Sequence, residues 1–355
     1  MQNPRRAREL GIVVGSQPTG ALNAITDVAG VRVGHTTIVE GDSIRTGVTA
    51  IVPTQLAERR SLPAGLAVGN GYGKLVGSTQ VAELGEIETP ILLTATLSAF
   101  RAADALLTYM LNQPGREGVQ SVNPFVGETN DGFLSDIRAR PVTEAHVLSA
   151  LEGASAERPA EGAVGAGTGT AALGYKAGIG TSSRQVATSH GAVTVGVLAQ
   201  ANFSGVLRVL GVPVPPDRVG VPNHLATPPA EPQRGGNSCV IVVAVDGRFD
   251  SRQLGRIARR AIFAMSRVGS DFAGGSGDYA LAFSTASADI ATVPESGVEP
   301  VFGAVQESVE EALLNSLFMA ETTQGYQGRV KYAVPHDRLL EVLRTHRVEL
   351  HPSRS

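Results

Sequence analysis

Hydrophobic and polar residues alternate in the first half of the chain with two different periods. Apolar residues at every second position predict a β-strand, and apolar residues three or four positions apart predict an amphipathic helix. The pattern predicts strands over residues 30–39 and 46–52, and helices over 98–112 and 143–151. In the first helix Ser98 is a candidate N-cap, and one face carries Ala102, Leu106, Leu107 and Met110.

The second half carries stronger strand signals. Residues 192–201 are mostly small and apolar, and 238–245 form a continuous run of β-branched and apolar residues, so both segments are predicted to be strands buried on both faces. The remaining predicted elements are strands over 173–186 and 279–285, and helices over 251–265, 305–320 and 336–345. Long helices beside buried strands predict an α/β (α+β) domain in which helices cover sheets.

Residues 210–236 interrupt this regular pattern. They contain seven prolines and end in Gly235-Gly236, directly before Asn237-Ser238. Proline lacks the backbone donor that a helix or sheet needs. We therefore expect an exposed, irregular linker that leads directly into the strand beginning at Ser238.

Composition narrows the class of protein. The chain of 355 residues is 42% hydrophobic, which is enough for one large core, and its net charge of −3 comes without a Lys/Arg run of the kind that binds nucleic acid. No apolar stretch indicates a secretory signal or a membrane span. The single cysteine, Cys239, excludes an internal disulfide framework, so we expect a cytoplasmic protein.

Ser238 is the candidate nucleophile. A hydroxyl residue at the start of a buried strand, directly after a linker, suits a hydrolase that cuts itself before that residue. The new N-terminal amine has an ordinary pKa of about 7.7–8.0 and can act as the base for its own hydroxyl. On the pattern alone, the simpler interpretation is a serine that begins a strand after a loop. Cys239 is the rival nucleophile, but its side chain is expected on the opposite strand face.

The sequence resembles the L-aminopeptidase/D-esterase family, which includes the β-peptidyl aminopeptidases. The resemblance covers nearly the whole chain, and its matches occur in order. They are residues 20–37 (GALNAITDVAGVRVGHTT), 175–184 (YKAGIGTSSR), 196–202 (GVLAQAN), 237–238 (NS), 276–285 (SGDYALAFST) and 334–337 (VPHD).

This resemblance implies an αββα four-layer sandwich of the self-processing N-terminal-nucleophile type, in one catalytic domain over 1–355. It implies cleavage between Asn237 and Ser238 into a large chain 1–237 and a small chain 238–355. It further implies a homo-oligomer, a tetramer of cleaved αβ units, and no cofactor. The substrate is expected to be a short peptide, amide or ester with a free N-terminal amine.

Roles for three further residues follow from the resemblance. Asn202 matches an asparagine whose amide helps to hold the oxyanion, whereas the simpler interpretation is an Asx turn that ends a strand. Ser276 and Asp278 match a hydroxyl–carboxylate pair that orients the nucleophile's amine, and the family often has glutamate at the position of Asp278. A glycine-rich turn is the alternative interpretation of residues 274–277.

Two charged residues also match functional positions of the family. Glu128 matches a glutamate that binds the substrate's ammonium group, and the alternative is a solvated loop carboxylate. Lys176, one of three lysines in the chain, matches a lysine near the nucleophile and bears on the oxyanion or on self-cleavage; the alternative is a surface lysine.

Other functions are less compatible with the sequence. Residues 69–74 (GNGYGK) lack the spacing of a phosphate-binding loop, and the scattered histidines show no metal-ligand spacing, so no metal is expected. Two alternatives stay open. A related self-cleaving acyltransferase acts on amino acids, but that family uses threonine as its nucleophile. A non-catalytic binding protein of the same fold would stay uncut.

Overall fold

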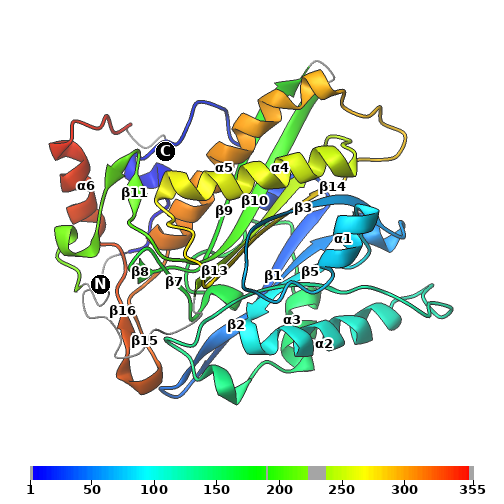
Figure 1. The fold of residues 1–355 in the computed structure, drawn as a ribbon, viewed down its shortest axis with the longest axis horizontal. Coiled ribbons are helices and arrows are strands. Elements are labelled where there is room, and N and C mark those ends of the chain that lie inside the picture. Colours follow the sequence, from blue (N-terminus) through cyan, green and yellow to red (C-terminus); the bar gives the residue numbers. More distant parts are fainter. Residues whose placement is uncertain (1–2, 189–190, 223–236, 352–355) are drawn as a thin grey trace.

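The computed structural model describes residues 3–188, 191–222 and 237–351, and these form four layers. Two sheets lie face to face between two layers of helices (Figure 1). The first sheet contains, in order, β1 (Val31–Glu40), β2 (Ile44–Pro53), β5 (Ile91–Ala95) and β6 (Phe125–Thr129). The second contains, in order, β4 (Glu86–Ile87), β3 (Leu62–Gly71), β14 (Ser276–Ser284), β13 (Asn237–Val245), β10 (Gly191–Asn202) and β9 (Ile179–Thr188).

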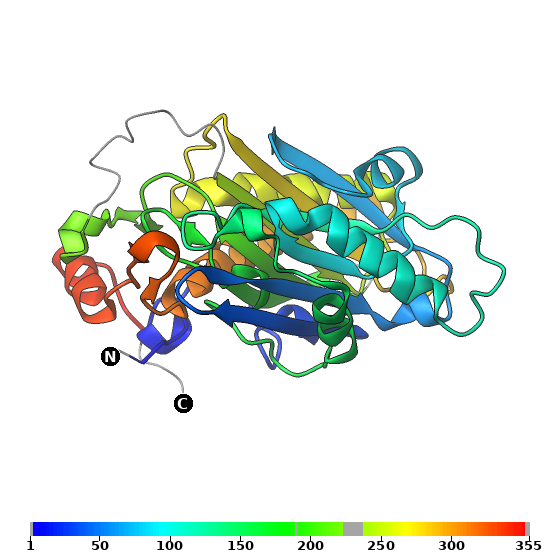
Figure 2. The ribbon, with the colours of Figure 1, turned by 90° about the horizontal axis from the view of Figure 1, so that it is seen from below.

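Helices cover the outer face of each sheet. The first sheet packs against α2 (Ala99–Leu111) and α3 (Glu144–Glu152), and the second against α4 (Ser251–Ala264) and α5 (Glu299–Phe318). Shorter elements are α1 (Ser78–Leu84), α6 (His336–Thr345), β7 (Ala171–Ala172), β8 (Tyr175–Lys176), β11 (Arg208–Val209), β12 (Val212–Pro213), β15 (Thr323–Gln324) and β16 (Val330–Lys331). Figure 2 shows α6 beside the two chain ends, away from α2.

Strand β13 illustrates why the strongest apolar run lies at the centre of the molecule. Its odd-numbered residues from Cys239 to Val245 pack in the core under α4 and α5, while Val240 and Val242 pack between the two sheets. Fully burying a side chain of this size contributes about 1.5–3 kcal/mol. A strand with two buried faces requires the continuous apolar pattern seen here.

Most predicted elements are confirmed, with three differences of detail. The predicted strand 173–186 is divided into β8 and β9, because Gly178 approaches the backbone so closely that a Cβ there would lie 1.7 Å from the Gly162 carbonyl oxygen. Helix α5 begins at Glu299 rather than at 305, with Pro300 in its first turn, where proline is tolerated. Ser98 precedes α2 but makes no side-chain cap bond.

The prediction for the Pro-rich segment is wrong over residues 210–222. Val212, Val214, Val219 and Val221 lie among the prolines and are buried in the core that also contains Leu339 and Leu343 of α6, and the Tyr175 hydroxyl donates to the Val214 carbonyl oxygen at 2.9 Å. The valines supply apolar surface that helps to order this segment, in which only β12 forms a short ladder with β11. Residues 223–236 lie outside the described residues. No helix within the described ranges has the length and apolar character to cross a membrane.

Candidate active site

Ser238 lies at the start of β13 between two neighbouring strands. It pairs with Asn202 of antiparallel β10 and with Gly277 of parallel β14. Its side chain shares the strand face of Val240, which packs between the sheets, whereas Cys239 packs under the helices. The prediction that the two side chains lie on opposite faces is therefore confirmed. Burial raises the pKa of the Cys239 thiol, which makes it a poor nucleophile.

The first sheet supplies a hydrogen-bond donor to Ser238. At Gly127 of β6, a Cβ would lie 2.9 Å from Val240 Cγ1, so glycine allows the two sheets to approach closely here. The chain that continues from β6 then places the Asn130 backbone N–H on Ser238 Oγ at 3.2 Å. A backbone donor at this position can also stabilise an oxyanion that forms beside the serine.

Asn202 is held on the same sheet face as Ser238, because directly paired residues of neighbouring strands point the same way. Its Oδ1 accepts the Ala171 N–H at 3.1 Å, so the other end of the amide is the NH2 donor. The residue ends β10 within the ladder and does not belong to an exposed turn. A fixed neutral donor of this kind suits charge that develops at a carbonyl oxygen.

Ser276 and Asp278 form a buried pair on the other face of the sheet. Ser276 Oγ donates to Asp278 Oδ1 at 2.7 Å, and Asn70 Nδ2 donates to Asp278 Oδ2 at 2.9 Å. In the parallel register, the pair stands opposite Asn237 and Cys239, on either side of Ser238. This position suits an interaction with the Ser238 nitrogen rather than with its hydroxyl. Burial raises the pKa of Asp278, and both donors oppose that effect.

Glu128 is a buried carboxylate near the end of β6 and is not the solvated loop acid of the alternative interpretation. Only 2% of it is exposed. Its Oε1 accepts the Lys74 backbone N–H at 2.8 Å, and its Oε2 accepts the Thr96 hydroxyl. Burial raises its pKa, while the Thr96 bond and Lys74 lower it. Glu128 is two residues before Asn130, so its backbone is about 6–7 Å along the chain from the donor to Ser238.

Lys176 is fully buried, which excludes the surface interpretation. Its ammonium donates to the carbonyl oxygens of Gly167, at 3.1 Å, and Ala177. Burial lowers its pKa to about 7, and Asp131 opposes the shift. Asp131 is also buried, its carboxylate oxygens accept no hydrogen bond from the described residues, and burial raises its pKa to about 7. The site therefore contains a weakly paired acid and base.

Three site residues escaped the sequence analysis. Asn70 belongs to the Gly-rich segment 69–74 that was considered only as a phosphate-binding loop, and an asparagine between glycines was the available signal. Asp131 is adjacent to the matched Glu128 segment and carried no separate signal. Asn130 contributes its backbone N–H, and such a role leaves no trace in a residue pattern.

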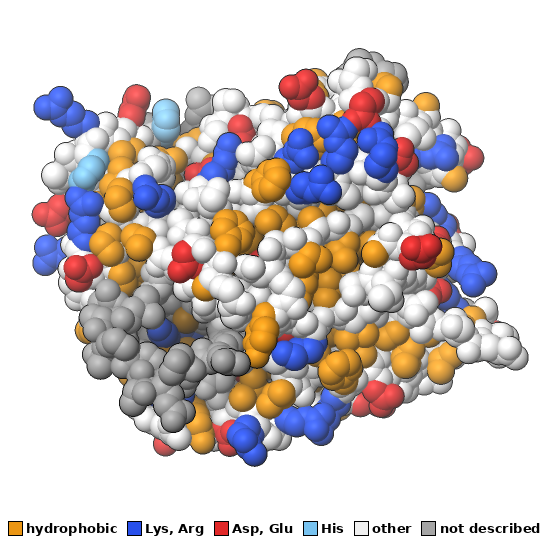
Figure 3. Space-filling model, in the orientation of Figure 1, with side chains coloured by type: hydrophobic (Ala, Val, Ile, Leu, Met, Phe, Trp, Pro, Cys, Tyr) orange, Lys and Arg blue, Asp and Glu red, His pale blue; other side chains and the backbone are white. Residues whose placement is uncertain are grey.

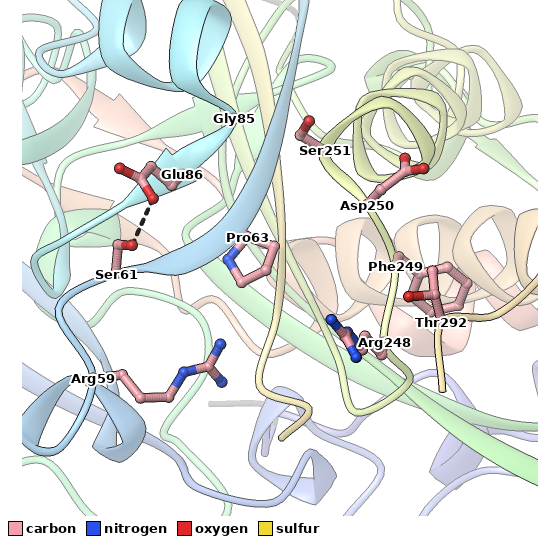
Figure 4. Close-up of a pocket in the computed structure, with 10 residues that line it drawn as sticks. All are labelled: Arg59, Ser61, Pro63, Gly85, Glu86, Arg248, Phe249, Asp250, Ser251 and Thr292. Carbon is pink, nitrogen blue, oxygen red and sulfur yellow. Dashed lines mark hydrogen bonds between the residues drawn. The ribbon is translucent and has the colours of Figure 1, made fainter. Parts of the chain in front are cut away.

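One cavity of the described residues, of about 530 Å³, lies near the predicted cleavage site, because its lining includes Ser204, whose Oγ accepts a hydrogen bond from Asn237 Nδ2 at 2.8 Å. Another, of about 360 Å³, lies beyond the opposite end of β13, between β3 and the start of α4 (Figure 4). Its two arginines already donate to backbone carbonyl oxygens, Arg59 to Ala286 and Arg248 to Ile290. Ser61 donates to Glu86.

The outer face of α4 carries a basic surface. Figure 3 shows arginine side chains gathered along this helix above a band of hydrophobic side chains. Arg256 and Arg260 lie over the Phe302 ring, 5.0 and 3.9 Å from its centroid, which accounts for part of this cluster as packing. Across the described residues, no three His, Cys, Asp or Glu side chains gather as a metal site.

Comparison with known proteins identifies consistent relatives. The model of peptidase family S58 matches residues 23–331. The chain is 38% identical to the β-peptidyl aminopeptidase BapA of Sphingosinicella xenopeptidilytica, over 96% of this chain and 91% of that protein.

Two solved structures are similar over nearly the whole chain. The β-aminopeptidase of Burkholderia sp. is 36% identical with a TM-score of 0.86, covering 96% of this chain and 99% of that one. The L-aminopeptidase D-Ala-esterase/amidase of Ochrobactrum anthropi is 34% identical with a TM-score of 0.85, covering 96% and 98%. The latter is described as a prototype for the serine aminopeptidases and as a new variant of the N-terminal-nucleophile hydrolase fold.

Proposed function

This chain belongs to peptidase family S58 and is a serine-type aminopeptidase of the N-terminal-nucleophile hydrolase type, and we propose that Ser238 is its nucleophile after cleavage of the Asn237–Ser238 bond. The observation that carries the proposal is the position of Ser238 at a strand start, with its Oγ 3.2 Å from the Asn130 N–H and Asn202 paired beside it.

Self-cleavage would begin with attack of Ser238 Oγ on the Asn237 carbonyl carbon. The C–N bond breaks, the nitrogen takes up the hydroxyl proton, and the Asn237 acyl group becomes an ester on Ser238. Water then hydrolyses the ester, which leaves a carboxylate at Asn237 and a free amine at Ser238. The products are a large chain 1–237, which retains the linker, and a small chain 238–355. Before cleavage the Ser238 nitrogen is an amide and cannot serve as a base.

After cleavage the free amine would remove the proton from its own hydroxyl. An ordinary α-amine has a pKa of about 7.7–8.0, near the value at which a general base is most effective. Ser276 and Asp278 would orient this amine from the helix-side face of the sheet. Attack on a substrate carbonyl gives an acyl-enzyme on Ser238, and the Asn202 amide and Asn130 N–H would hold the oxyanion in both steps.

Glu128 would bind the free ammonium of the substrate. Its buried carboxylate has no ion-pair partner within 4 Å in the described part of the chain, so a substrate ammonium would supply a direct ion-pair partner. The proposed substrates are short peptides, amides or esters with an unblocked N-terminus. The names of the relatives, which specify β-peptide, amide and ester bonds, support this range.

Lys176 is proposed as a positioning residue. By holding the carbonyl oxygens of Gly167 and Ala177, it orders the segment that contains Ala171, whose N–H fixes the Asn202 amide. Its effect on the oxyanion would then pass through Asn202. Lys176→Met should lower kcat and slow self-cleavage while leaving KM for a small substrate little changed.

The two alternative functions have less support. An acyltransferase of the related self-cleaving type uses threonine, and the comparisons favour an aminopeptidase over both an acyltransferase and a non-catalytic binding protein. The assembly of four αβ units and the cytoplasmic location stay proposals that rest on the family resemblance and on composition.

The proposal is tested with the Ser238→Ala variant beside the wild type. Both are purified and incubated under the same conditions, and cleavage and hydrolysis of alanine p-nitroanilide are measured. The wild type should be cut and active, and the variant uncut and inactive. An uncut but active wild type would contradict the role of the N-terminal amine.

A further inference from the structure

The chain has three lysines among thirty basic residues, and each of them either is a proposed site residue or contacts a segment that carries one. Lys176 is buried beside Asp131 and is bound by backbone carbonyl oxygens. Lys331 lies over the Phe133 ring at 4.5 Å, next to the loop that includes Asn130. Lys74 contacts Glu128 through its backbone. Of the three, Lys74 is the one attached to the proposed ammonium-binding carboxylate.

The Lys74 ammonium belongs to the residue that contacts the Glu128 carboxylate, and this ammonium has no ion-pair partner among the described residues. The ammonium lies 5.6 Å from the centroid of the Tyr72 ring, and no carboxylate of the described residues approaches it within 4 Å. Lys74 is half-buried and Tyr72 is 55% exposed, so the cation lies at the rim of the site rather than free in solvent. Burial raises the pKa of Glu128 and the Lys74 charge lowers it, which is the direction expected for a cation near the carboxylate that the Lys74 backbone N–H already contacts at 2.8 Å.

Opposite charges side by side are complementary to a zwitterionic group. An N-terminal residue that bears a carboxylate presents an ammonium and a carboxylate separated by about 3–5 Å from standard bond lengths. Its ammonium would bind Glu128, and its carboxylate would reach toward Lys74 over the Tyr72 ring. A substrate with a cationic side chain would instead meet repulsion from Lys74.

On the basis of the proposed function, we propose that Lys74 is a specificity-determining residue that binds a carboxylate on the N-terminal residue of the substrate. The favoured substrates are then peptides or amides of an acidic amino acid. Two linkages share this chemistry. In an α-linked aspartyl substrate the carboxylate is the side chain. In a β-linked aspartyl substrate the carboxylate is the α-carboxylate. The amine is then on the carbon β to the scissile carbonyl, as in the β-peptides that the name of one relative mentions.

The neighbouring residues explain why the carboxylate would belong to the acyl side of the substrate. Lys74 N is bound to Glu128 at 2.8 Å, and Glu128 would hold the amine of the residue whose carbonyl Ser238 attacks. A carboxylate on the leaving group lies beyond that carbonyl and is separated from the amine by a full residue. The Lys74 cation is therefore placed for the N-terminal residue.

The experiment compares purified wild type, Lys74→Gln and Lys331→Gln on four p-nitroanilides: alanyl, α-aspartyl, β-aspartyl and lysyl. The measured quantity is kcat/KM for each acidic or basic substrate divided by that for the alanyl substrate. In the wild type at least one aspartyl ratio should exceed the lysyl ratio. Lys74→Gln should lower that aspartyl ratio about 10- to 100-fold, as expected for a charge-assisted hydrogen bond, and raise the lysyl ratio. The matched variant Lys331→Gln should leave the ratios unchanged.

Several outcomes would overturn the inference. Equal changes of all four substrates in Lys74→Gln would show a role in folding or in holding Glu128. A wild type that prefers the lysyl substrate to both aspartyl substrates would contradict the carboxylate site directly. If Lys74→Gln instead lowered kcat/KM for alanylglycine relative to alaninamide, the cation would bind a carboxylate on the leaving group, because only alanylglycine has one there. If the wild type cleaves none of the four substrates, both the proposed function and this inference are contradicted. If the wild type cleaves the alanyl substrate and Lys74→Gln leaves the ratios of kcat/KM unaltered, only the inference is contradicted.

Discussion

Glu128→Gln tests the proposed recognition of the substrate's amine. The change preserves size and removes the negative charge. The amide oxygen can still accept the Lys74 N–H, and the new NH2 can donate to the Thr96 hydroxyl, which reverses that bond. Burial raises the pKa of Glu128, which means that the folded protein disfavours its charge. We therefore expect a Tm equal to or above that of the wild type at neutral pH.

The effect on catalysis should be large and specific to free amines. Removing one partner of a buried, hydrogen-bonded charge pair costs about 2–5 kcal/mol, which corresponds to a loss of kcat/KM of about 30- to 5,000-fold. Most of the loss should appear in KM, because the ammonium is bound in the ground state as well as in the transition state.

The assay compares alanine p-nitroanilide with propionyl p-nitroanilide, which lacks only the amine. Glu128→Gln should lower kcat/KM for the first substrate and leave or improve the slow turnover of the second. A matched control is Glu88→Gln, since Glu88 is also buried and accepts hydrogen bonds from Asn123; it should discriminate between the two substrates no more than the wild type does.

The pH dependence gives the same test a second readout. Glu128 must be ionised to attract the ammonium, so kcat/KM for the alanine substrate should fall as the pH is lowered through the pKa of Glu128. Because that pKa is raised by burial, the fall should begin at a higher pH than for an ordinary glutamate. This dependence should disappear in Glu128→Gln. Equal losses on both substrates, or no loss on either, would refute the reasoning.

Variants at four further residues test other parts of the site. Asp278→Asn should lower kcat about 10²–10⁴-fold, while Asp278→Glu should retain activity. Asn70→Ala removes a hydrogen-bond donor to the Asp278 carboxylate, so it should move the acid limb of the pH profile of kcat to higher pH. An unchanged pH profile would contradict the role of the Ser276–Asp278 pair. Asn202→Ala should lower kcat about 10²–10³-fold with little change in KM, and a pure KM effect would exclude an oxyanion role. Asp131→Asn should raise stability: burial raises the Asp131 pKa from 3.8 to about 7, so the folded state binds more protons in that interval and wild-type stability falls as the pH rises through it. In urea titrations the variant's advantage should be absent below pH ~4 and reach at most ~4 kcal/mol above pH ~7, and an advantage that is independent of pH would be inconsistent with this cause.

The central strand that begins at Ser238 was predictable from the sequence, whereas β3 of the second sheet and β5 and β6 of the first sheet were harder to find. The run 238–245 has a single interpretation because a strand with two buried faces needs apolar residues at every position. Strands β3, β5 and β6 were not predicted. β3 contains several glycines, and β5 and β6 have five residues each, which is too short for a periodic signal.

The site was predictable only where side chains carry its chemistry. Glu128, Asn202 and the Ser276–Asp278 pair were expected in the site from the family resemblance. The positions of Asn202, Ser276 and Asp278 beside Ser238 depend on strand register, which is set by the pairing of segments that are distant in the sequence. The Asn130 N–H reaches Ser238 because Gly127 lets two sheets approach, a condition set by packing. The Pro-rich segment was predicted to be exposed because its prolines argue against regular structure, although four valines among them are buried in the core.

The most direct test of the account is the intact mass of the purified protein beside that of Ser238→Ala, followed by identification of the new N-terminus. The account predicts two fragments from the wild type, 1–237 and 238–355, with the smaller beginning at Ser238, and one uncut chain from the variant. A wild type that remains a single chain through long incubation, or one cut at another bond, would contradict the claim that Ser238 becomes an N-terminal nucleophile.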